Sequence, residues 1–227
     1  IDEAANGFAD RVSITLNRDG SATVEDNGRG IPVDEHPQLK VPAVQVVFTQ
    51  LHAGGKFDNK SYQYSGGLHG VGASVVNALS RKLTVEVAVG GMLYRQEYAS
   101  EYDDAQKKVI AGKPVTDLME LGRTRRKGSR ITFWPDDRIF DDIRFNREVI
   151  ARRVRELAFL NPGITLILTD DRLNREDENR EVSFCYHGGI ADYVKYVNSD
   201  KTVLFDSPIY LKGKQDGVLI EIAIQYN

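Results

Sequence analysis

Residues 65–80, SGGLHGVGASVVNALS, constrain the fold of this chain more than any other segment. Glycines at positions 66, 67, 70 and 72 lead directly into an apolar run with helical spacing. This pattern predicts a loop that enters the N-terminus of a helix. Such a junction offers unpaired backbone N–H groups and the positive end of the helix dipole, which favour phosphate. A glycine-rich surface turn before an ordinary core helix explains the glycine spacing equally well.

The two most familiar phosphate loops do not fit this segment. A dinucleotide-binding fingerprint needs a buried strand before its first glycine, whereas the residues at 58–65 are the polar DNKSYQYS. A Walker loop needs Gly-Lys followed by Ser or Thr, and here Gly55-Lys56 is followed by Phe57. The ligand therefore has to be inferred from other parts of the chain.

The composition is typical of a soluble globular protein. The 227 residues are 41% hydrophobic and 28% charged, enough for one large domain or two small ones. The net charge of −3 gives no overall electrostatic signal for nucleic acid, and we find neither a membrane-length apolar run nor a leader. The single cysteine, Cys185, cannot form an internal disulfide, which suits a reducing compartment, and we expect it to be a buried structural thiol.

Both ends of the sequence read as interrupted elements. Residues 1–5 have the pattern of the last turns of a helix that Gly7 terminates. Residues 218–227 alternate like a strand and stop without a turn. We therefore expect a piece of a longer protein.

Most of the chain divides into short strands and helices. We predict helices from Pro42, after residue 72, at 146–160 with Asn146 as the cap, and at 190–197. We predict strands at 11–16, 21–25, 129–134, 164–169 and 181–186, a hairpin at 82–98 that turns at Gly90-Gly91, and two strands after Pro208. The stretch 99–127 shows no clear pattern. Because hairpin-length turns join most neighbouring strands, the sequence predicts an α+β fold with a mainly antiparallel sheet and helices on one side.

Asp26 is the strongest candidate for ligand recognition. It lies where a strand gives way to the glycine turn DNGRG. Read alone, this motif is better explained by an aspartate that stabilises the turn. The functional interpretation is a carboxylate that accepts a hydrogen bond from the amino group of adenine, a preference that would reject guanine.

The other candidate residues carry less weight individually. Lys56 could fold over phosphates, His69 is interpreted as a loop contact without a nearby acid, and Ser129 could donate a hydroxyl to a ligand or merely begin its strand. The basic cluster at 123–127 is interpreted as a solvated loop, because it lacks aromatic partners. No Cys/His set has the spacing of metal ligands.

Five motifs in order carry a resemblance that covers essentially the whole chain. They are IDEA at 1–4, DNGRGIP at 26–32, LHAGGKF at 51–57, SGGLHGVG at 65–72, and GS at 128–129 with FWPD at 133–136. Together they resemble the ATPase domain of bacterial type II topoisomerases, of the gyrase B or topoisomerase IV type, within the GHKL ATPase superfamily.

The resemblance implies a two-layer α/β sandwich, the Bergerat fold, in which helices cover one face of a mixed sheet and ATP lies beneath a lid. Residues 1–217 would form the ATPase domain, and residues 218–227 the first strand of a truncated transducer domain.

The resemblance also assigns roles. Asp26 would hold the adenine amino group, Arg29, Gly30, Ile31 and Pro32 would line the adenine edge, and Ser129 would lie near the base. Asp2 and Glu3 would line the pocket. The residues that meet the phosphates would be Lys56, Tyr62, Gly67, Leu68, His69, Gly70, Val71 and Gly72.

Three departures from the family pattern matter. The general-base glutamate and the magnesium-ligating asparagine are expected upstream of Ile1, so the chain itself contributes no catalytic or metal-binding residue. The lysine that senses the γ-phosphate is expected in the transducer domain. Val89 stands where many gyrases carry an arginine. The resemblance therefore does not imply that this chain is sensitive to inhibitors that bind through that arginine.

The implied protein is a cytoplasmic, ATP- and Mg²⁺-dependent isomerase without membrane attachment. Its expected partners are DNA, a second copy of itself, a gyrase A-type subunit and aminocoumarin-like inhibitors. Two alternatives stay open: another ATPase of the superfamily, of the mismatch-repair or chaperone type, or an inert binding module. By itself the chain is expected to bind nucleotide weakly and to hydrolyse little.

Overall fold

The computed structural model describes residues 1–51, 70–216 and 218–227. Nine strands form one sheet with the order β5-β4-β3-β7-β2-β1-β8-β9, and β6 also pairs with β4. Every pairing is antiparallel except that of β1 with β8. The strands are β1 (Arg11–Leu16), β2 (Ala22–Asp26), β3 (Ser80–Val89), β4 (Met92–Asp103), β5 (Lys108–Pro114), β6 (Met119–Arg123), β7 (Gly128–Pro135), β8 (Thr165–Asp170) and β9 (Glu181–Phe184).

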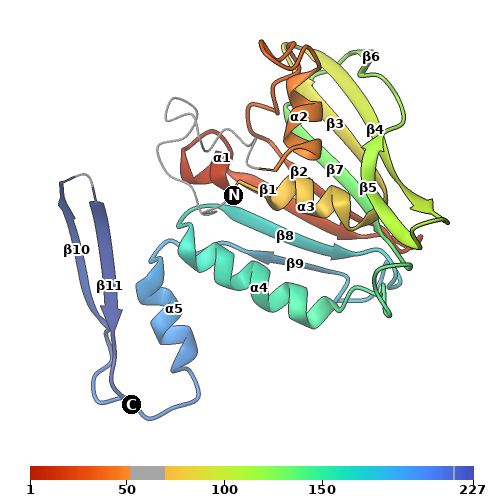
Figure 1. The fold of residues 1–227 in the computed structure, drawn as a ribbon. Coiled ribbons are helices and arrows are strands. Elements are labelled where there is room, and N and C mark those ends of the chain that lie inside the picture. The colour runs from red at the N-terminus through yellow and green to blue at the C-terminus, as the bar shows by residue number, and fades with distance from the viewer. Residues whose placement is uncertain (52–69, 217) are drawn as a thin grey trace.

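The helices lie on one face of this sheet, as Figure 1 shows. They are α1 (Asp2–Ala5), α2 (Ala43–Thr49), α3 (Gly72–Ala78) and α4 (Arg147–Leu160). The expected α+β sandwich with a mixed, mainly antiparallel sheet is therefore confirmed. The predicted cap is also present, since Asn146 Oδ1 accepts a hydrogen bond of 3.0 Å from Val149 N.

Strand alternation decides which residues face the helices. On β3, Leu83, Val85 and Val87 are buried in a core cluster with Val44 and Phe48 of α2. Their neighbours point to the opposite, open face of the sheet. Because successive side chains alternate, this open face collects a polar set. It lines a hollow of about 380 Å³ formed by Ser13, Thr15, Asn17, Thr23, Glu25, Thr84, Glu86, Arg95, Arg130, Thr132 and Trp134.

The α5 helix (Ile190–Val197) and a hairpin of β10 (Ile209–Gln215) and β11 (Val218–Ile224) follow the sheet. The hairpin forms a separate two-stranded sheet and stands apart from the nine strands in Figure 1. Its pairing joins Ile209 to Ile224 and Gln215 to Val218. None of the helices in the described ranges is long and apolar enough to cross a bilayer.

One sequence-based expectation was wrong here and two were incomplete. Cys185 is exposed, because the strand ends one residue earlier, at Phe184. The apolar stripe expected on α3 is only partly present: Ala73 and Val76 pack against the core, whereas Val75 is 39% exposed. The residues that α3 buries are Ser74 and Asn77. The unpatterned stretch after residue 99 contains the end of β4 and all of β5 and β6.

Candidate functional site

Asp26 is the last residue of β2, and its half-buried side chain lies on the helix-covered face of the sheet. Asp26 Oδ1 accepts a hydrogen bond of 2.8 Å from Gly28 N. Burial raises the pKa of this carboxyl above its ordinary value. Backbone hydrogen bonds from Gly28 and Ser129 oppose that rise, and the negative charge of Glu3 adds to it. Since a carboxylate has about four acceptor positions, Asp26 can accept further donors from a ligand.

Two glycines allow the backbone to close tightly around this carboxylate. A Cβ on Gly28 would lie 2.6 Å from Glu3 Oε2 and 2.9 Å from Asp26 Oδ1. A Cβ on Gly128 would lie only 2.1 Å from Asp26 O, and Gly128 has φ +95. Any other residue at these positions would displace Asp26 or its neighbours. The DNGRG turn and the start of β7 therefore form one packed unit around Asp26.

The first helix closes one side of this unit. Glu3 Oε2 accepts from Arg29 N at 2.8 Å, and Glu3 Oε1 lies 2.8 Å from Arg29 Nη2. The Arg29 guanidinium also lies over the Phe8 ring, 3.5 Å from its centroid. Asp2 is half-buried on the same helix, where its carbonyl accepts from Asn6 Nδ2. Glu3 and Arg29 are thus brought next to Asp26, with Arg29 held by an ion pair.

Ser129 connects β7 to the segment that follows the turn. Its buried hydroxyl oxygen accepts a hydrogen bond of 3.1 Å from Ile31 N. Gly30 lies against Val87 and Ala88 of β3, and Pro32 is exposed. Ile31 packs on the core cluster of α2 and β3, as do Ala73 of α3 and Val89. This cluster links the Asp26 turn to the helix that follows the glycine-rich loop.

The phosphate-binding half of the expected site is described only in part. Val71 is the N-cap of α3, whose first residue is Gly72, and Gly70 precedes it with φ +61. Five of the expected residues, Lys56, Tyr62, Gly67, Leu68 and His69, lie outside the described residues. The hollow on the open face contains none of the expected nucleotide-binding residues. The site is therefore defined by the contacts around Asp26.

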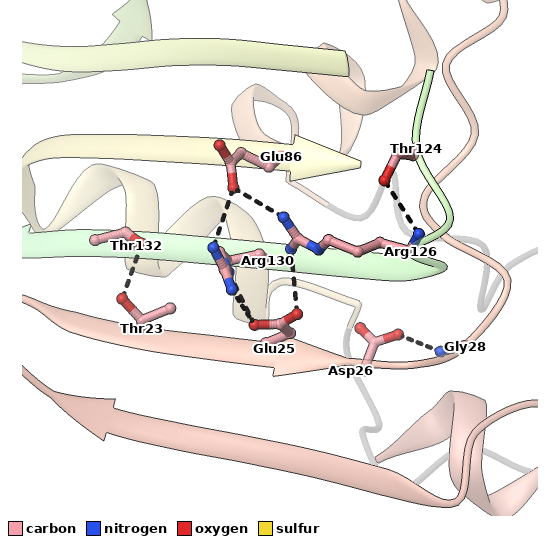
Figure 2. A network of polar contacts seen from close by, with 9 residues as sticks. All are labelled: Thr23, Glu25, Asp26, Gly28, Glu86, Thr124, Arg126, Arg130 and Thr132. Atoms are coloured by element: carbon pink, nitrogen blue, oxygen red, sulfur yellow. Dashed lines mark hydrogen bonds and ion pairs between the residues drawn. The ribbon is translucent and has the colours of Figure 1, made fainter. Parts of the chain in front are cut away.

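A charged network on the open face was missed by sequence reasoning. Arg126 and Arg130 each lie between Glu25 and Glu86, as Figure 2 shows. The cluster at 123–127 had been interpreted as a solvated loop, and this is wrong for Arg126. Exposure alternates along the loop, so Arg126 points inward while Arg125 and Lys127 are exposed. The sequence carried no signal for this difference, because residues 125–127 are all basic.

The described side chains offer no metal centre. Within the ranges 1–51, 70–216 and 218–227, no group of three or more His, Cys, Asp or Glu side chains could hold a metal ion.

Residues 1–139 match the protein family described as histidine kinase-, DNA gyrase B-, and HSP90-like ATPases. The match covers more than half of the chain, so the chain belongs to this ATPase family. Curated relatives narrow the class, because the chain is similar to the B subunits of type II topoisomerases of both the gyrase and the topoisomerase 4 kind.

Three relatives represent the range of these matches. The B subunit of the type 2 topoisomerase of Aquifex aeolicus is 46% identical over 226 residues, covering 100% of this chain and 26% of the relative. The B subunit of DNA gyrase from Haloferax volcanii is 47% identical over 225 residues, covering 99% of this chain and 33% of the relative. The B subunit of DNA topoisomerase 4 from Streptococcus pneumoniae is 44% identical over 230 residues, covering 100% of this chain and 33% of the relative. The chain thus spans a quarter to a third of their length.

A solved structure supports the same family. The 43K ATPase domain of Thermus thermophilus gyrase B, in complex with an aminocoumarin, superimposes with a TM-score of 0.75 at 35% identity. The match covers 98% of this chain and 52% of that chain. The family resemblance predicted from the five sequence motifs is therefore confirmed.

Proposed function

We propose that this chain binds ATP with its adenine amino group at Asp26, as part of a longer type II topoisomerase of the gyrase B type. The observation that carries this proposal is the half-buried Asp26 carboxylate, held by two backbone amides inside a glycine turn, in a chain of this ATPase family. Adenine offers an amino donor at the position where guanine offers a carbonyl, so the carboxylate favours ATP over GTP.

The remaining roles follow from the family. Arg29, Gly30, Ile31 and Pro32 are proposed to line the adenine edge, with Ser129 near the base and Asp2 and Glu3 at the pocket wall. The residues proposed to meet the phosphates are Lys56, Tyr62, Gly67, Leu68, His69, Gly70, Val71 and Gly72.

Hydrolysis is proposed to use groups beyond residues 1–227. A glutamate and a magnesium-ligating asparagine before Ile1 would activate water and hold Mg²⁺, and a lysine of the following domain would contact the γ-phosphate. The residues of this chain would bind and orient the nucleotide. The division at residue 217 is also a proposal, and because β10 pairs with β11, we extend the second unit to include β10.

In the whole protein, ATP binding would favour pairing with a second copy and drive passage of one DNA duplex through another, together with a gyrase A-type subunit. The gyrase B relatives favour supercoiling, and the topoisomerase 4 relative at 44% identity keeps decatenation as the alternative. Aminocoumarin-like inhibitors are proposed to bind at the ATP site, because the similar Thermus ATPase domain forms a complex with an aminocoumarin. Val89 would weaken any inhibitor that depends on an arginine there.

The test is a calorimetric titration of ATP and GTP into the chain and into Asp26→Ala. We expect the chain to prefer ATP and the variant to lose both the affinity and the preference. Equal affinity for the two nucleotides in the unchanged chain would contradict the proposal and would favour an inert binding module.

A further inference from the structure

Three neighbouring strands carry the candidate site on one face and a row of charges on the other. On β2, Glu25 precedes Asp26, and on β7, Arg130 follows Ser129. Glu25 is the register partner of Arg130, which is in turn the partner of Glu86 on β3. Because side chains alternate, the Glu25–Arg130–Glu86 row lies directly behind the residues that hold the expected base.

The ion pairs along this row are continuous. Arg130 Nη2 lies 2.7 Å from Glu25 Oε2, and Arg130 Nη1 lies 3.7 Å from Glu86 Oε2. Arg126 adds a second bridge, with distances of 3.1 Å to Glu25 Oε1 and 3.8 Å to Glu86 Oε2. No side chain in this group of two cations and two anions is more than 40% exposed. Such networks hold their members more firmly than single surface pairs do.

Arg126 extends the network from the strands to the loop before β7. Its backbone N–H donates to Thr124 Oγ1 at 3.0 Å, and its guanidinium reaches back to β2 and β3. In the view of Figure 2, the Arg126 side chain lies above Asp26 and Gly28, near the end of β2. Gly128, two residues further on, has its backbone pressed against Asp26 O. A displacement of this loop would therefore move Asp26 or break its hydrogen bond from Ser129.

We propose that the network of Glu25, Glu86, Arg126 and Arg130 on the open face positions Asp26 and Ser129 for adenine recognition. Arg126 and Arg130 are positioning residues that never touch the nucleotide. The inference rests on the proposed function, because it explains how the base-recognition geometry is maintained.

Glu25 on β2 and Glu86 on β3 lie on either side of β7. Removal of either arginine leaves less positive charge between these two carboxylates. Their repulsion would loosen the β2–β7–β3 register at the end where Asp26 lies. Since coupling within partly exposed networks is about 1 kcal/mol, the affinity for ATP should fall roughly three- to tenfold. The affinity for GTP does not depend on the adenine amino contact and should stay near its original value.

The experiment is calorimetric titration of ATP and GTP into Arg126→Gln and Arg130→Gln at low and high salt. We expect a lower ratio of ATP to GTP affinity in both variants. High salt should lower the ratio in the unchanged chain toward that of the variants, because salt screens the network. Arg126→Lys retains the charge and should restore most of the preference.

Two control variants match these changes. Arg125→Gln removes the same charge from an outward-facing neighbour in the same loop. Thr132→Val removes the 2.9 Å hydrogen bond between Thr23 Oγ1 and Thr132 Oγ1. This bond also joins β2 to β7, but farther from Asp26. Both controls should keep the original ratio of affinities.

Two results would overturn the inference while the proposed function survives. One is an Arg126→Gln variant with the ATP preference of Arg125→Gln. The other is a parallel loss of ATP and GTP affinity, which indicates general destabilisation. An unchanged chain without any ATP preference would overturn the proposed function as well.

Discussion

Asp26 and Asp136 are both withdrawn from water, yet their pKa values move in opposite directions. Asp136 is fully buried, and side-chain hydrogen bonds from Arg138, assisted by Ser100, hold its pKa far below the ordinary value. Within residues 1–51, 70–216 and 218–227, no arginine or lysine side chain is hydrogen-bonded to Asp26, so burial dominates and raises its pKa. A carboxylate whose pKa is raised by desolvation is more typical of a binding site than of a structural ion pair.

The first prediction concerns Asp26→Asn. Because the pKa of Asp26 is raised in the folded chain, its charge opposes folding at neutral pH, and the neutral variant should have a Tm at or above that of the unchanged chain. ATP affinity should nevertheless fall by about tenfold or more, because the carboxylate is the stronger acceptor. Differential scanning fluorimetry and calorimetry at pH 7.5 measure both quantities.

The pH dependence of ATP binding provides the matching control. In the unchanged chain, affinity should decline as the pH falls toward the raised pKa of Asp26, at a higher pH than an ordinary aspartate would require. In Asp26→Asn this part of the decline should be missing. Identical pH profiles would show that the Asp26 carboxylate does not contact the base.

The second prediction concerns Asp136→Asn, which leaves Arg138 without its full countercharge. A depressed pKa stabilises the fold above the unfolded value of about 3.9, and this stability is lost as the pH falls. At pH 7 the variant should lose about 2 kcal/mol of unfolding free energy. Urea denaturation at pH 7 and pH 3 should show a smaller difference at the lower pH, because the stabilisation is lost only below the unfolded pKa. A constant difference between these two pH values would exclude the charge as its cause.

At the scale of residues, the sequence singled out Asp26, whose role in binding the base stays a prediction, but it did not predict the charged network behind it. Asp26 was recognisable because DNGRG combines a strand end with glycines. Arg126 was not, because a run of basic residues does not reveal which side chain faces Glu25 until the register of β2 and β7 is known.

Among the elements, α3 depends on a buried polar residue that its apolar pattern did not predict. Asn77 Nδ2 donates to Phe48 O at 2.9 Å and to Gly112 O at 2.8 Å, which joins α3 to α2 and to β5. Asn77 Oδ1 is buried and has no partner among the described residues. The amide therefore fixes the distance between the end of α2 and the helix that follows the glycine-rich loop.

The third prediction tests the contact between Asn77 and β5 by changing Gly112, the residue of β5 that accepts the hydrogen bond. An added Cβ at Gly112 would lie 2.3 Å from Asn77 Oδ1, so Gly112→Ala should force the amide away and lower the unfolding free energy by about 2 kcal/mol. The control is Gly213→Ala in β10, where nothing lies within 4 Å of the added atom. Urea denaturation should show little change in the control, and equal losses would exclude the clash with Asn77.

The elements themselves were predictable wherever one face is consistently apolar. The turn at Gly90-Gly91, the α4 helix with its cap, and α5 all lie as predicted. β5 and β6 were missed because they share the exposed outer edge of β4, where burial is too slight to impose alternation. The register shifts in both pairings weaken the pattern further.

At the scale of the molecule, one aromatic cluster joins α4, which packs on the large sheet, to α5. Phe159 of α4 is buried and stacks on Tyr186 with ring centroids 3.7 Å apart. It also contacts Tyr193 and Tyr196 of α5, at 5.3 and 5.5 Å. The hairpin beyond α5 leaves large apolar side chains exposed on both strands, including Leu211 and Ile220. Because β11 contacts α5 and α5 contacts α4, the position of the hairpin relative to the sheet depends on this cluster.

The fourth prediction is that Phe159→Ala weakens the packing of α5 against α4 while the large sheet stays folded. Removing a buried phenylalanine costs about 3–5 kcal/mol, and here most of its ring contacts are with α5 and Tyr186. Hydrogen exchange should therefore accelerate about a hundredfold or more in residues 190–197, whereas the amides of β3 and β7 stay protected. The control is Phe140→Ala, because Phe140 is already 40% exposed and its removal should leave exchange in α5 unchanged. If protection fell equally in β3 and in α5, Phe159 would belong to one cooperative core, and the hairpin could not move independently of the candidate ATP site.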